Sequence, residues 1–182
     1  IRNYRYVGFG STYFADSNLV HKSLGINKLL SIEKEEELHY KNRVNFNKPY
    51  SCIEMEFGDS SEVLPRLPWK KWKKTIVWLD YTGKLTANII GDIDTVISSL
   101  KPGSIFLISV NIEQDSSGST DIQNNKEKRI AWRLNKLENR IGKKHIPTRA
   151  NSLDLNIENN NRVIRQVIDN TINNCLNVRN NV

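Results

Sequence analysis

The sequence has few of the features that mark a secreted, membrane-spanning or metal-binding protein. It contains two cysteines, Cys52 and Cys175, and their spacing fits no metal-ligand motif. We expect buried free thiols in a reducing compartment, with Cys52 in a strand and Cys175 in a helix. No apolar run is long enough to cross a bilayer, and the first residues form neither a charged leader nor an apolar signal segment. These absences favour a cytoplasmic protein without a membrane partner.

The composition is typical of one globular domain. The chain has 182 residues, of which 38% are hydrophobic, and its mean hydropathy is −0.54. We expect a single domain over residues 1–182, with a core at 1–111 and a loop plus helices at 112–182. Residue 1 is Ile rather than Met, which is compatible with a fragment of a longer chain. The net charge of +7 is weakly suggestive of an anionic partner.

Five short apolar segments predict buried strands. They are Tyr4–Gly8, Lys28–Glu33, Ser51–Phe57, Thr75–Leu79 and Ile105–Val110. Segments compatible with helices lie between them, at Tyr13–Leu24, Glu33–Arg43, Ser61–Leu67 and Leu85–Leu100. This alternation indicates βαβ units with right-handed crossovers, and therefore a parallel sheet that is covered on both faces.

The remaining chain predicts a helical segment. Residues 114–125 are polar and read as a mobile loop, and Lys126–Ile141 has the spacing of an amphipathic helix. Leu153, Leu155 and Ile157 alternate with polar residues and could make a short strand, and a last helix follows over Glu158–Leu176. The basic stretch 126–144 is a candidate contact for an anionic, nucleic-acid partner. The alternative is a plain solvated helix face.

A basic, aromatic connector, Trp69–Lys74, leads into the fourth strand. Its two indoles between lysines could stack on bases and bind phosphates. The alternative is that the indoles fold onto the edge of the sheet.

A glycine turn ends the first strand, in Val7-Gly-Phe-Gly-Ser11. Glycine allows a close approach to the backbone, and a helix that follows directs its free N–H groups back at the turn. Such a strand, turn and helix is how α/β proteins bring the backbone up to a nucleotide-like ligand, although two glycines alone are a weak signal.

Carboxylates follow the next three strands, at Glu33, Asp59 and Asp80. In an open parallel sheet, ligands bind outside the carboxyl ends of the strands. An acid after the second strand can accept hydrogen bonds from a ribose diol, and one after the third from an adenine amine. An acid after the fourth strand faces the reacting end of such a nucleotide-like ligand. The structural alternative is that these are ordinary rim charges, with Asp80 capping the helix that follows.

Taken together, these motifs resemble the class I S-adenosylmethionine-dependent methyltransferase family over residues 4–111. The resemblance rests on Val7–Ser11, Leu30–Glu33, Gly58–Ser61, Leu79–Tyr81 and the Pro-Gly turn of Lys101–Ser104. It implies a Rossmann-like, mostly parallel open sheet of strand order 3-2-1-4-5 with helices on both faces. It also implies S-adenosylmethionine as the cofactor. The family's sheet ends in two further strands, for which this chain has no candidates.

The resemblance also implies a set of site residues. Those expected to bind the cofactor are Tyr6, Gly8, Phe9, Gly10, Ser11, Asp16, Glu33, Lys34, Asp59, Ser60 and Asp80. Asp80 and Tyr81 are the expected catalytic pair, facing the transferred methyl and orienting the acceptor. Two positions depart from the family pattern. Tyr6 stands where the family has an acid, with Asp16 as the candidate replacement, and Thr12 stands at the third glycine.

The predicted function is methyl transfer to an unidentified acceptor. An oxygen nucleophile is favoured, because Leu79–Tyr81 is not the Asn/Asp-Pro-Pro-Tyr motif of base-directed enzymes. One alternative is a catalytically silent domain that binds a nucleotide or a partner. Another is a nicotinamide-dependent dehydrogenase. The G-x-G-x-x-G motif of such enzymes is incomplete here, because position 13, where its third glycine would stand, is Tyr.

Overall fold

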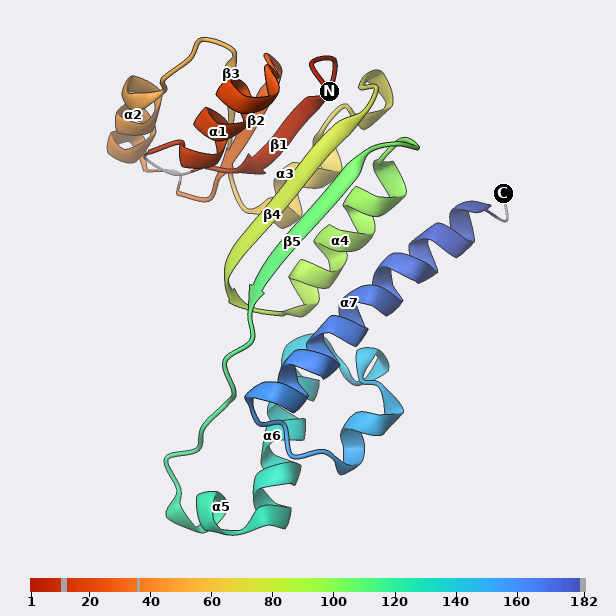
Figure 1. Cartoon of the computed structure of the whole chain (residues 1–182). Helices are drawn as coiled ribbons and strands as arrows, with labels where there is room; N and C mark the ends of the chain where they lie inside the picture. The colour runs from red at the N-terminus through yellow and green to blue at the C-terminus, as the bar shows by residue number, and fades with distance from the viewer. Residues whose placement is uncertain (11–12, 36, 181–182) are drawn as a thin grey trace. The chain divides into compact units, whose positions relative to one another are not determined.

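The computed structural model describes residues 1–10, 13–35 and 37–180 (Figure 1). The chain divides into two compact units, where the sequence predicted one domain. Unit 1 comprises residues 1–81 and 95–109, and unit 2 comprises residues 82–94 and 110–182. The division near residue 110 lies close to the expected limit of the core at 111, but residues 82–94 fall in unit 2.

The α/β part of the chain alternates strands and helices as predicted. Its elements in order are β1 (Arg5–Phe9), α1 (Ala15–Leu24), β2 (Leu29–Glu33), α2 (Leu38–Asn47), β3 (Ile53–Phe57), α3 (Ser60–Arg66), the 3₁₀ turn η1 (Trp69–Lys71), β4 (Thr75–Lys84), α4 (Ala87–Ser99) and β5 (Ile105–Asn111).

The strands form one five-stranded parallel sheet in the order β3-β2-β1-β4-β5, which confirms the predicted order (Figure 1). Its register is set by β1, because this strand pairs with β2 on one side and β4 on the other. Gly8 lies opposite Ser31 of β2 and Trp78 of β4. The pairing of β2 with β3 places Glu33 opposite Phe57. These pairs determine which side chains meet where the strands end.

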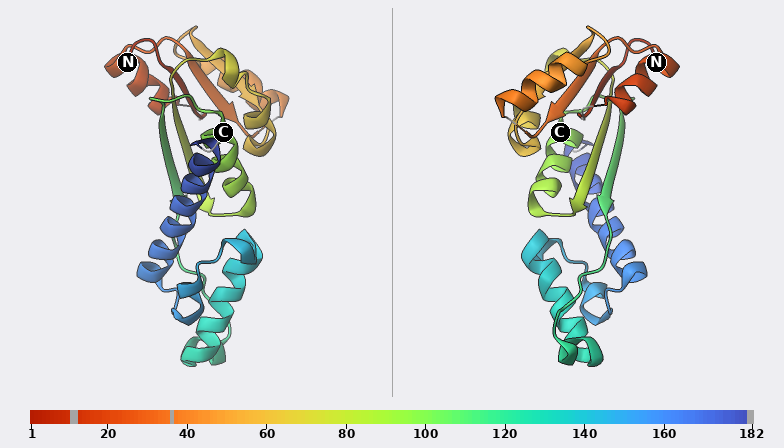
Figure 2. Two further views of the ribbon diagram at one scale, coloured as in Figure 1. Left: turned by 90° about the vertical axis from the view of Figure 1, so that its right-hand side faces the viewer. Right: turned by 90° about the vertical axis from the view of Figure 1, so that its left-hand side faces the viewer.

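Helices cover both faces of the sheet, as predicted, and each face of unit 1 has its own hydrophobic cluster (Figure 2). One cluster combines α1 and α2 with alternate strand residues, among them Tyr6, Phe14, Val20, Leu29, Val44, Ile53 and Ile76. The other combines α3, η1 and the end of α4 with the intervening strand residues, among them Val7, Leu30, Ile32, Val63, Leu64, Val77, Leu79, Val96 and Leu100. Because strand side chains alternate between faces, odd and even positions of β1 belong to different clusters.

Two elements differ from the predicted ones. β4 was expected to end at Leu79 but continues to Lys84, so Asp80 and Tyr81 lie inside the strand. Tyr and Thr favour extended backbone, which supports this extension. α2 was expected to begin at Glu33 but begins at Leu38, because pairing with Phe57 holds Glu33 in β2. The cysteine expectations hold in part: Cys175 is buried in α7 (Ile157–Asn180), while Cys52 is half-buried and precedes β3.

Unit 2 is helical beyond β5. It contains α5 (Thr120–Asn124), α6 (Lys126–Ile141), the 3₁₀ turns η2 (Lys143–His145) and η3 (Thr148–Ser152), and α7. α5 lies within the segment predicted as a mobile loop. The short strand predicted at 153–157 is wrong, because η3 precedes it and α7 begins at Ile157. The side chain of Asn156 accepts a hydrogen bond from the Asn159 backbone N–H, which starts α7 at that point.

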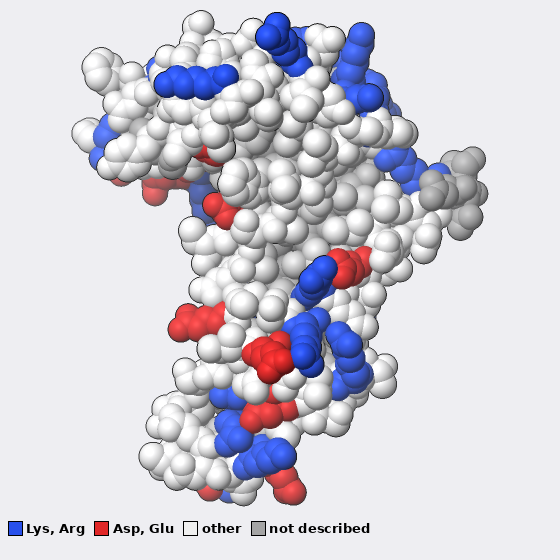
Figure 3. Space-filling view, in the orientation of Figure 1, with Lys and Arg blue, Asp and Glu red and all other residues white. Residues whose placement is uncertain are grey.

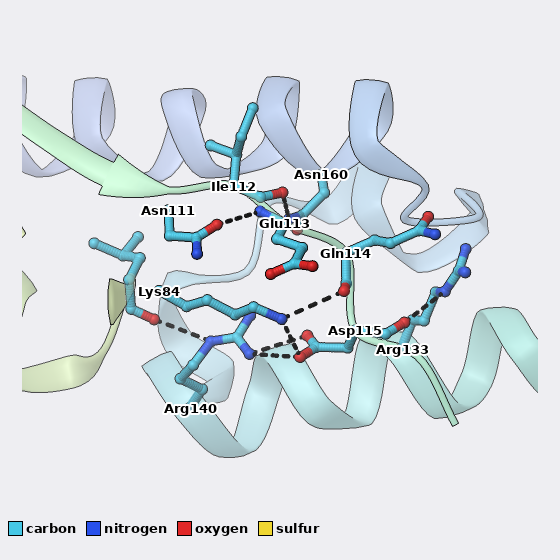
Figure 4. Close-up of polar contacts among 10 residues, drawn as sticks. Lys84, Asn111, Ile112, Glu113, Gln114, Asp115, Arg133, Arg140 and Asn160 are labelled. Carbon is cyan, nitrogen blue, oxygen red and sulfur yellow. Dashed lines mark hydrogen bonds and ion pairs between the residues drawn. The ribbon is translucent and has the colours of Figure 1, made fainter. Parts of the chain in front are cut away.

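Two aspartates, Asp115 and Asp154, organise the polar interior of unit 2, and Figure 4 shows the contacts of Asp115. The Asp115 carboxylate binds Lys84 Nζ and Arg140 Nη1, each at 2.9 Å, and its backbone oxygen accepts a hydrogen bond from Arg133. The Asp154 carboxylate binds Arg129 and Arg133, at 2.9 and 2.6 Å. Three arginines of α6, Arg129, Arg133 and Arg140, are therefore paired with carboxylates inside unit 2, where two carboxylates are shared among four cations.

Asp115→Asn tests the weight of this network. The substitution leaves two half-buried cations with a neutral partner, so we expect the free energy of unfolding at pH 7 to fall by about 1–3 kcal/mol. The matched control is Asp121→Asn, which breaks a pair with Lys128 in which both side chains are more than half exposed. The control should cost about 0–1 kcal/mol. Urea unfolding measures both, and equal losses would contradict the role of Asp115.

The same comparison has a pH dependence. Burial raises the pKa of Asp115, but the hydrogen bonds and charges of Lys84 and Arg140 outweigh it, so the pKa lies below its usual value. A lowered folded-state pKa stabilises the fold above the unfolded-state value, about pH 3.9, and this stabilisation is lost as the pH falls below it. The difference between wild type and Asp115→Asn should shrink below about pH 4.

Candidate functional site

The candidate site of unit 1 lies where β1, β2 and β4 end. Gly8, Ser31 and Trp78 are level in the sheet, so the positions two residues further on are Gly10, Glu33 and Asp80. The Gly10 backbone N–H donates to Ile32 O at 2.7 Å and continues this register beyond β1. The structure therefore brings the glycine turn and two of the three predicted carboxylates to one level.

A side chain at Gly10 would force its neighbours to shift. A Cβ atom there would lie 2.7 Å from Ser31 Oγ and 3.4 Å from Glu33 Oε2. The absence of a side chain thus lets the first turn approach the Glu33 carboxylate directly. Ser31 was not predicted as part of the site, although a polar residue two positions before the acid, in a buried strand, was a signal for it.

Tyr6 occupies the space beside Gly8. Residues i and i+2 of a strand share a face, and the Tyr6 ring lies across the missing side chain of Gly8. Its hydroxyl donates a hydrogen bond to Asp16 Oδ2 at 2.6 Å. The predicted replacement acid is thereby tied to the position that holds the acid in the family pattern.

The pKa of Tyr6 lies far above its ordinary value. Burial is the largest cause, followed by the hydrogen bond to Asp16 and by the negative charges of Asp16 and Asp80. Tyr6 is therefore a neutral donor at every physiological pH. Two carboxylates that act on one buried phenol make this corner of the site negative, which suits a cationic ligand group.

The start of α1 has a special backbone. Phe14 is 1% exposed and adopts φ 50°, ψ 37°, a left-handed conformation that is rare for a bulky residue. Within the described part of the chain, no side chain caps the helix, so its first N–H groups are available on the side of the glycine turn. Sequence reasoning missed Phe14, because no residue pattern predicts a left-handed phenylalanine.

Glu33 closes β2 and is half-buried. Burial raises its pKa, and the hydrogen bonds from the Tyr40 hydroxyl, at 2.8 Å, and from the Lys34 backbone oppose this rise. The net direction is upward, so the carboxyl group of Glu33 gives up its proton less readily than that of an exposed glutamate. Tyr40 was also missed, since it reaches Glu33 only through the placement of α2.

Asp59 begins α3 as its N-cap. Its Oδ1 accepts hydrogen bonds from the backbone N–H and the hydroxyl of Ser61, and its Oδ2 lies 3.0 Å from Lys34 Nζ. The hydrogen bond from Lys34 is the main cause that lowers its pKa. The Gly58 backbone N–H donates to Glu33 O, which places this cap beside the end of β2. Ser60 is the first residue of α3.

Asp80 and Tyr81 were expected to face the acceptor together, and the extended strand separates them. Successive side chains of a strand point to opposite faces. The charge of Asp80 acts on Tyr6, whereas the Tyr81 ring packs edge-on against Phe9 at 4.8 Å, in the other cluster. Asp80 is also no helix cap, because α4 begins at Ala87. Ser11 and the departure at Thr12 lie outside the described residues.

Comparison with known proteins identifies the family. The model of a family described as "Putative O-methyltransferase" matches residues 1–182, so the chain belongs to that family. This confirms the resemblance to S-adenosylmethionine-dependent methyltransferases and agrees with S-adenosylmethionine as the cofactor. A comparison with curated proteins found no match.

A solved structure of LepI in complex with SAH and a substrate analogue aligns at a TM-score of 0.44 and 8% identity. The alignment covers 70% of this chain and 32% of that chain, so this chain spans about a third of the other's length. Among the described residues, no group of His, Cys, Asp or Glu side chains is arranged to hold a metal ion. In the same part of the chain, no helix has both the length and the apolarity that crossing a bilayer requires.

Gly8→Ala tests the arrangement of the site. The new Cβ would lie 2.3 Å from the Tyr6 hydroxyl oxygen and 2.7 Å from Cζ, so the buried ring must shift. We expect the free energy of unfolding to fall by about 1–3 kcal/mol. Gly83→Ala is the matched control, since a Cβ atom on this strand glycine would have no described heavy atom within 4 Å. Chemical denaturation of the two variants measures the difference, and equal stability would contradict the placement of Tyr6.

Proposed function

We propose that this member of the O-methyltransferase family transfers a methyl group from S-adenosylmethionine to an oxygen acceptor at the ends of β1, β2 and β4. The observation that carries the proposal is the approach of Glu33 Oε2 to within 3.4 Å of the position that a Gly10 side chain would take. This close approach makes a cradle of backbone and carboxylate of the kind that a nucleoside needs. When bound, the cofactor supplies an electrophilic methyl group on its sulfonium.

The adenosine end of the cofactor would be held by the ends of β2 and β3. Glu33 has the acceptor oxygens for a ribose diol, and the Tyr40 hydroxyl fixes one of them. Asp59 and Ser60 would meet the adenine. Asp59 already caps α3 and pairs with Lys34, so any bond to an adenine amine would share its oxygens with those partners. Lys34 would then neutralise Asp59 rather than contact the cofactor.

The methionine end would be held by Asp16. Its carboxylate lies in the first turn of α1, near the positive end of the helix dipole. Tyr6 holds it with a hydrogen bond whose donor cannot ionise at physiological pH. In this proposal, Tyr6 is a positioning residue, and Asp16 binds the ammonium group that the family's usual acid would bind. The family acid is thus replaced by a tyrosine–aspartate pair.

Asp80 is the candidate for handling the acceptor's proton. It is exposed and on the face of β4 that carries Trp78, toward Tyr6. A carboxylate there can accept a hydrogen bond from a hydroxyl group and orient its oxygen. Tyr81 would support this position from the other face by packing on Phe9. The family's description favours oxygen as the acceptor atom.

Calorimetry with S-adenosylhomocysteine tests the cofactor site. Wild type should bind at micromolar concentration. Glu33→Gln should bind about ten-fold more weakly or worse, because it removes a charged acceptor. Asp59→Asn should cost several-fold, and asparagine keeps the cap, which avoids unfolding α3. Glu54→Gln is the control. Glu54 lies near the start of β3, where it pairs with Arg5 of β1, and is therefore away from the carboxyl ends of the strands that form the candidate site.

Two results would contradict the proposal. Tighter binding of NAD than of S-adenosylhomocysteine would favour a dehydrogenase. Binding of neither ligand would leave a catalytically silent domain. With binding shown, transfer of labelled methyl to RNA, DNA, protein and small-molecule pools would then identify the acceptor, and Asp80→Ala should lower turnover while binding persists.

A second comparison tests the tyrosine–aspartate pair. Asp16→Asn should weaken cofactor binding about ten-fold, by loss of the charge, and Tyr6→Phe about three- to ten-fold, by loss of the positioning hydrogen bond. Because Tyr6 acts through Asp16, the double variant should lose less than the sum of the two free energies. Tyr4→Phe is the matched control, since its hydroxyl donates to Gly103 O at 2.7 Å at the other edge. Additive losses would contradict the pair.

A further inference from the structure

The edge of the sheet where the strands begin is cationic. The segments that lead into the five strands, residues 1–5, 25–28, 48–52, 67–74 and 100–104, contain no Asp or Glu. Their cations are Arg2, Arg5, Lys28, Lys48, Lys70, Lys71, Lys73, Lys74 and Lys101. In Figure 3, this edge of unit 1 shows only blue side chains, and the red ones of unit 1 lie toward the other edge. We call it the amino-end face.

Backbone contacts hold most of these segments side by side. The Tyr6 N–H donates to Lys28 O, and the Arg5 N–H donates to Lys74 O. The Lys101 ammonium donates to Lys70 O at 3.0 Å. The cations of the β2, β1, β4 and β5 segments therefore form a row in the order of the strands.

Most of this charge is not compensated by carboxylates. Arg5 pairs with Glu54 at 3.0 Å, and the structure gives no ion pair to the other cations within the described ranges. Lys101 donates to a carbonyl, and Lys74 lies over the Tyr4 ring at 5.9 Å, and neither partner carries a charge. Arg2, Lys28 and the lysines of 70–74 are exposed. This contrasts with α6, whose Arg129, Arg133 and Arg140 are paired with Asp115 and Asp154.

The indoles of the connector are not available for stacking on bases. Trp69 is 7% exposed, and its Nε1–H donates to Leu64 O at 2.8 Å. Trp72 packs on Trp69 with ring centroids 5.1 Å apart, and Arg5 covers its ring at 4.5 Å. The alternative that the indoles fold onto the sheet is therefore the one observed. Of the connector's two kinds of side chain, only the lysines remain available to contact a partner.

We propose that the amino-end face binds the phosphate backbone of a nucleic acid without reading its sequence. Four neighbouring strand starts extend over about 14 Å, at roughly 4.8 Å for each step between strands. One strand of a duplex presents about four phosphates over that length. A membrane surface fits less well, because Ile1 alone among the described, exposed large apolar residues belongs to these segments, and interfacial binding needs a larger apolar area.

This surface lies at the edge of the sheet opposite the candidate cofactor site. A nucleic acid bound there is tethered to the protein, and its phosphates are not presented to the methyl group. The inference therefore goes beyond the proposed function and holds whether or not the chain binds S-adenosylhomocysteine.

The test measures the anisotropy of a labelled single-stranded RNA with the full chain, between about 50 and 200 mM salt. With four contacts, the slope of log affinity against log salt should be about −3. Lys71→Gln with Lys73→Gln should reduce affinity roughly 25-fold at 0.1 M salt and make the slope shallower by about 1.4. The control, Lys143→Gln with Lys144→Gln, removes the same charge from unit 2 and should change affinity less than about two-fold.

Several outcomes would overturn the proposal. These are no RNA binding by wild type at the lowest salt, an equal loss in both variants, a larger loss in the control, or binding to vesicles with anionic lipid but not to RNA. A larger loss in the control would instead support the predicted contact at 126–144. If duplex DNA also binds, and the substitutions at Lys71 and Lys73 weaken its binding by the same factor, this would also support a contact with the phosphate backbone. The single variants, each with about a five-fold loss, keep the test valid if the double variant unfolds.

Discussion

The parallel pairing of β1 with β2 and β4 is the constraint on which the rest of unit 1 depends. Once Gly8 is opposite Ser31 and Trp78, every later position in these strands has a determined level and face. Gly10 then meets Glu33, and Asp80 lies on the same side as Tyr6. A shift of one residue would reverse the face of every side chain in the shifted strand and break this alignment. The hydrophobic alternation that builds the core is therefore also what assembles the site.

The same alternation explains the most unusual feature of the site. Tyr6 precedes Gly8 by two residues and shares its face, so its ring can lie flat only because Gly8 has no side chain. Gly8 thus leaves space for the Tyr6 side chain of the same strand, whereas Gly10 leaves space for Ser31 and Glu33 of the neighbouring strand. The buried phenol carries the hydrogen-bonding role outward to Asp16. The Asp16 carboxylate is thus held beside Tyr6, the position that carries an acid in the family pattern.

Charge is distributed unevenly over the molecule, and for different reasons in the two units. In unit 1, the acids of the strand ends and the cations of the strand starts lie at opposite edges of the sheet, because a parallel sheet gathers all its starts at one edge. In unit 2, cations and acids interleave: Asp115 and Asp154 each bind two cations and connect α6 to neighbouring segments. A net charge of +7 alone does not distinguish cations on an open surface from cations paired with carboxylates.

The sequence by itself determined the alternation of strands and helices, the layers and the positions of the glycine turn and of Glu33 and Asp59, because apolar runs and turn residues are local signals. The sheet order was implied by the resemblance to a known family and not by those signals. It did not determine that β4 runs through Asp80 and Tyr81, since the length of a strand depends on the backbone around it. Nor could it show that Tyr40 reaches Glu33, or that α6's arginines turn to Asp115 and Asp154, far along the chain. Those contacts exist only when separate elements of the chain are packed together, and the tertiary structure alone decided them.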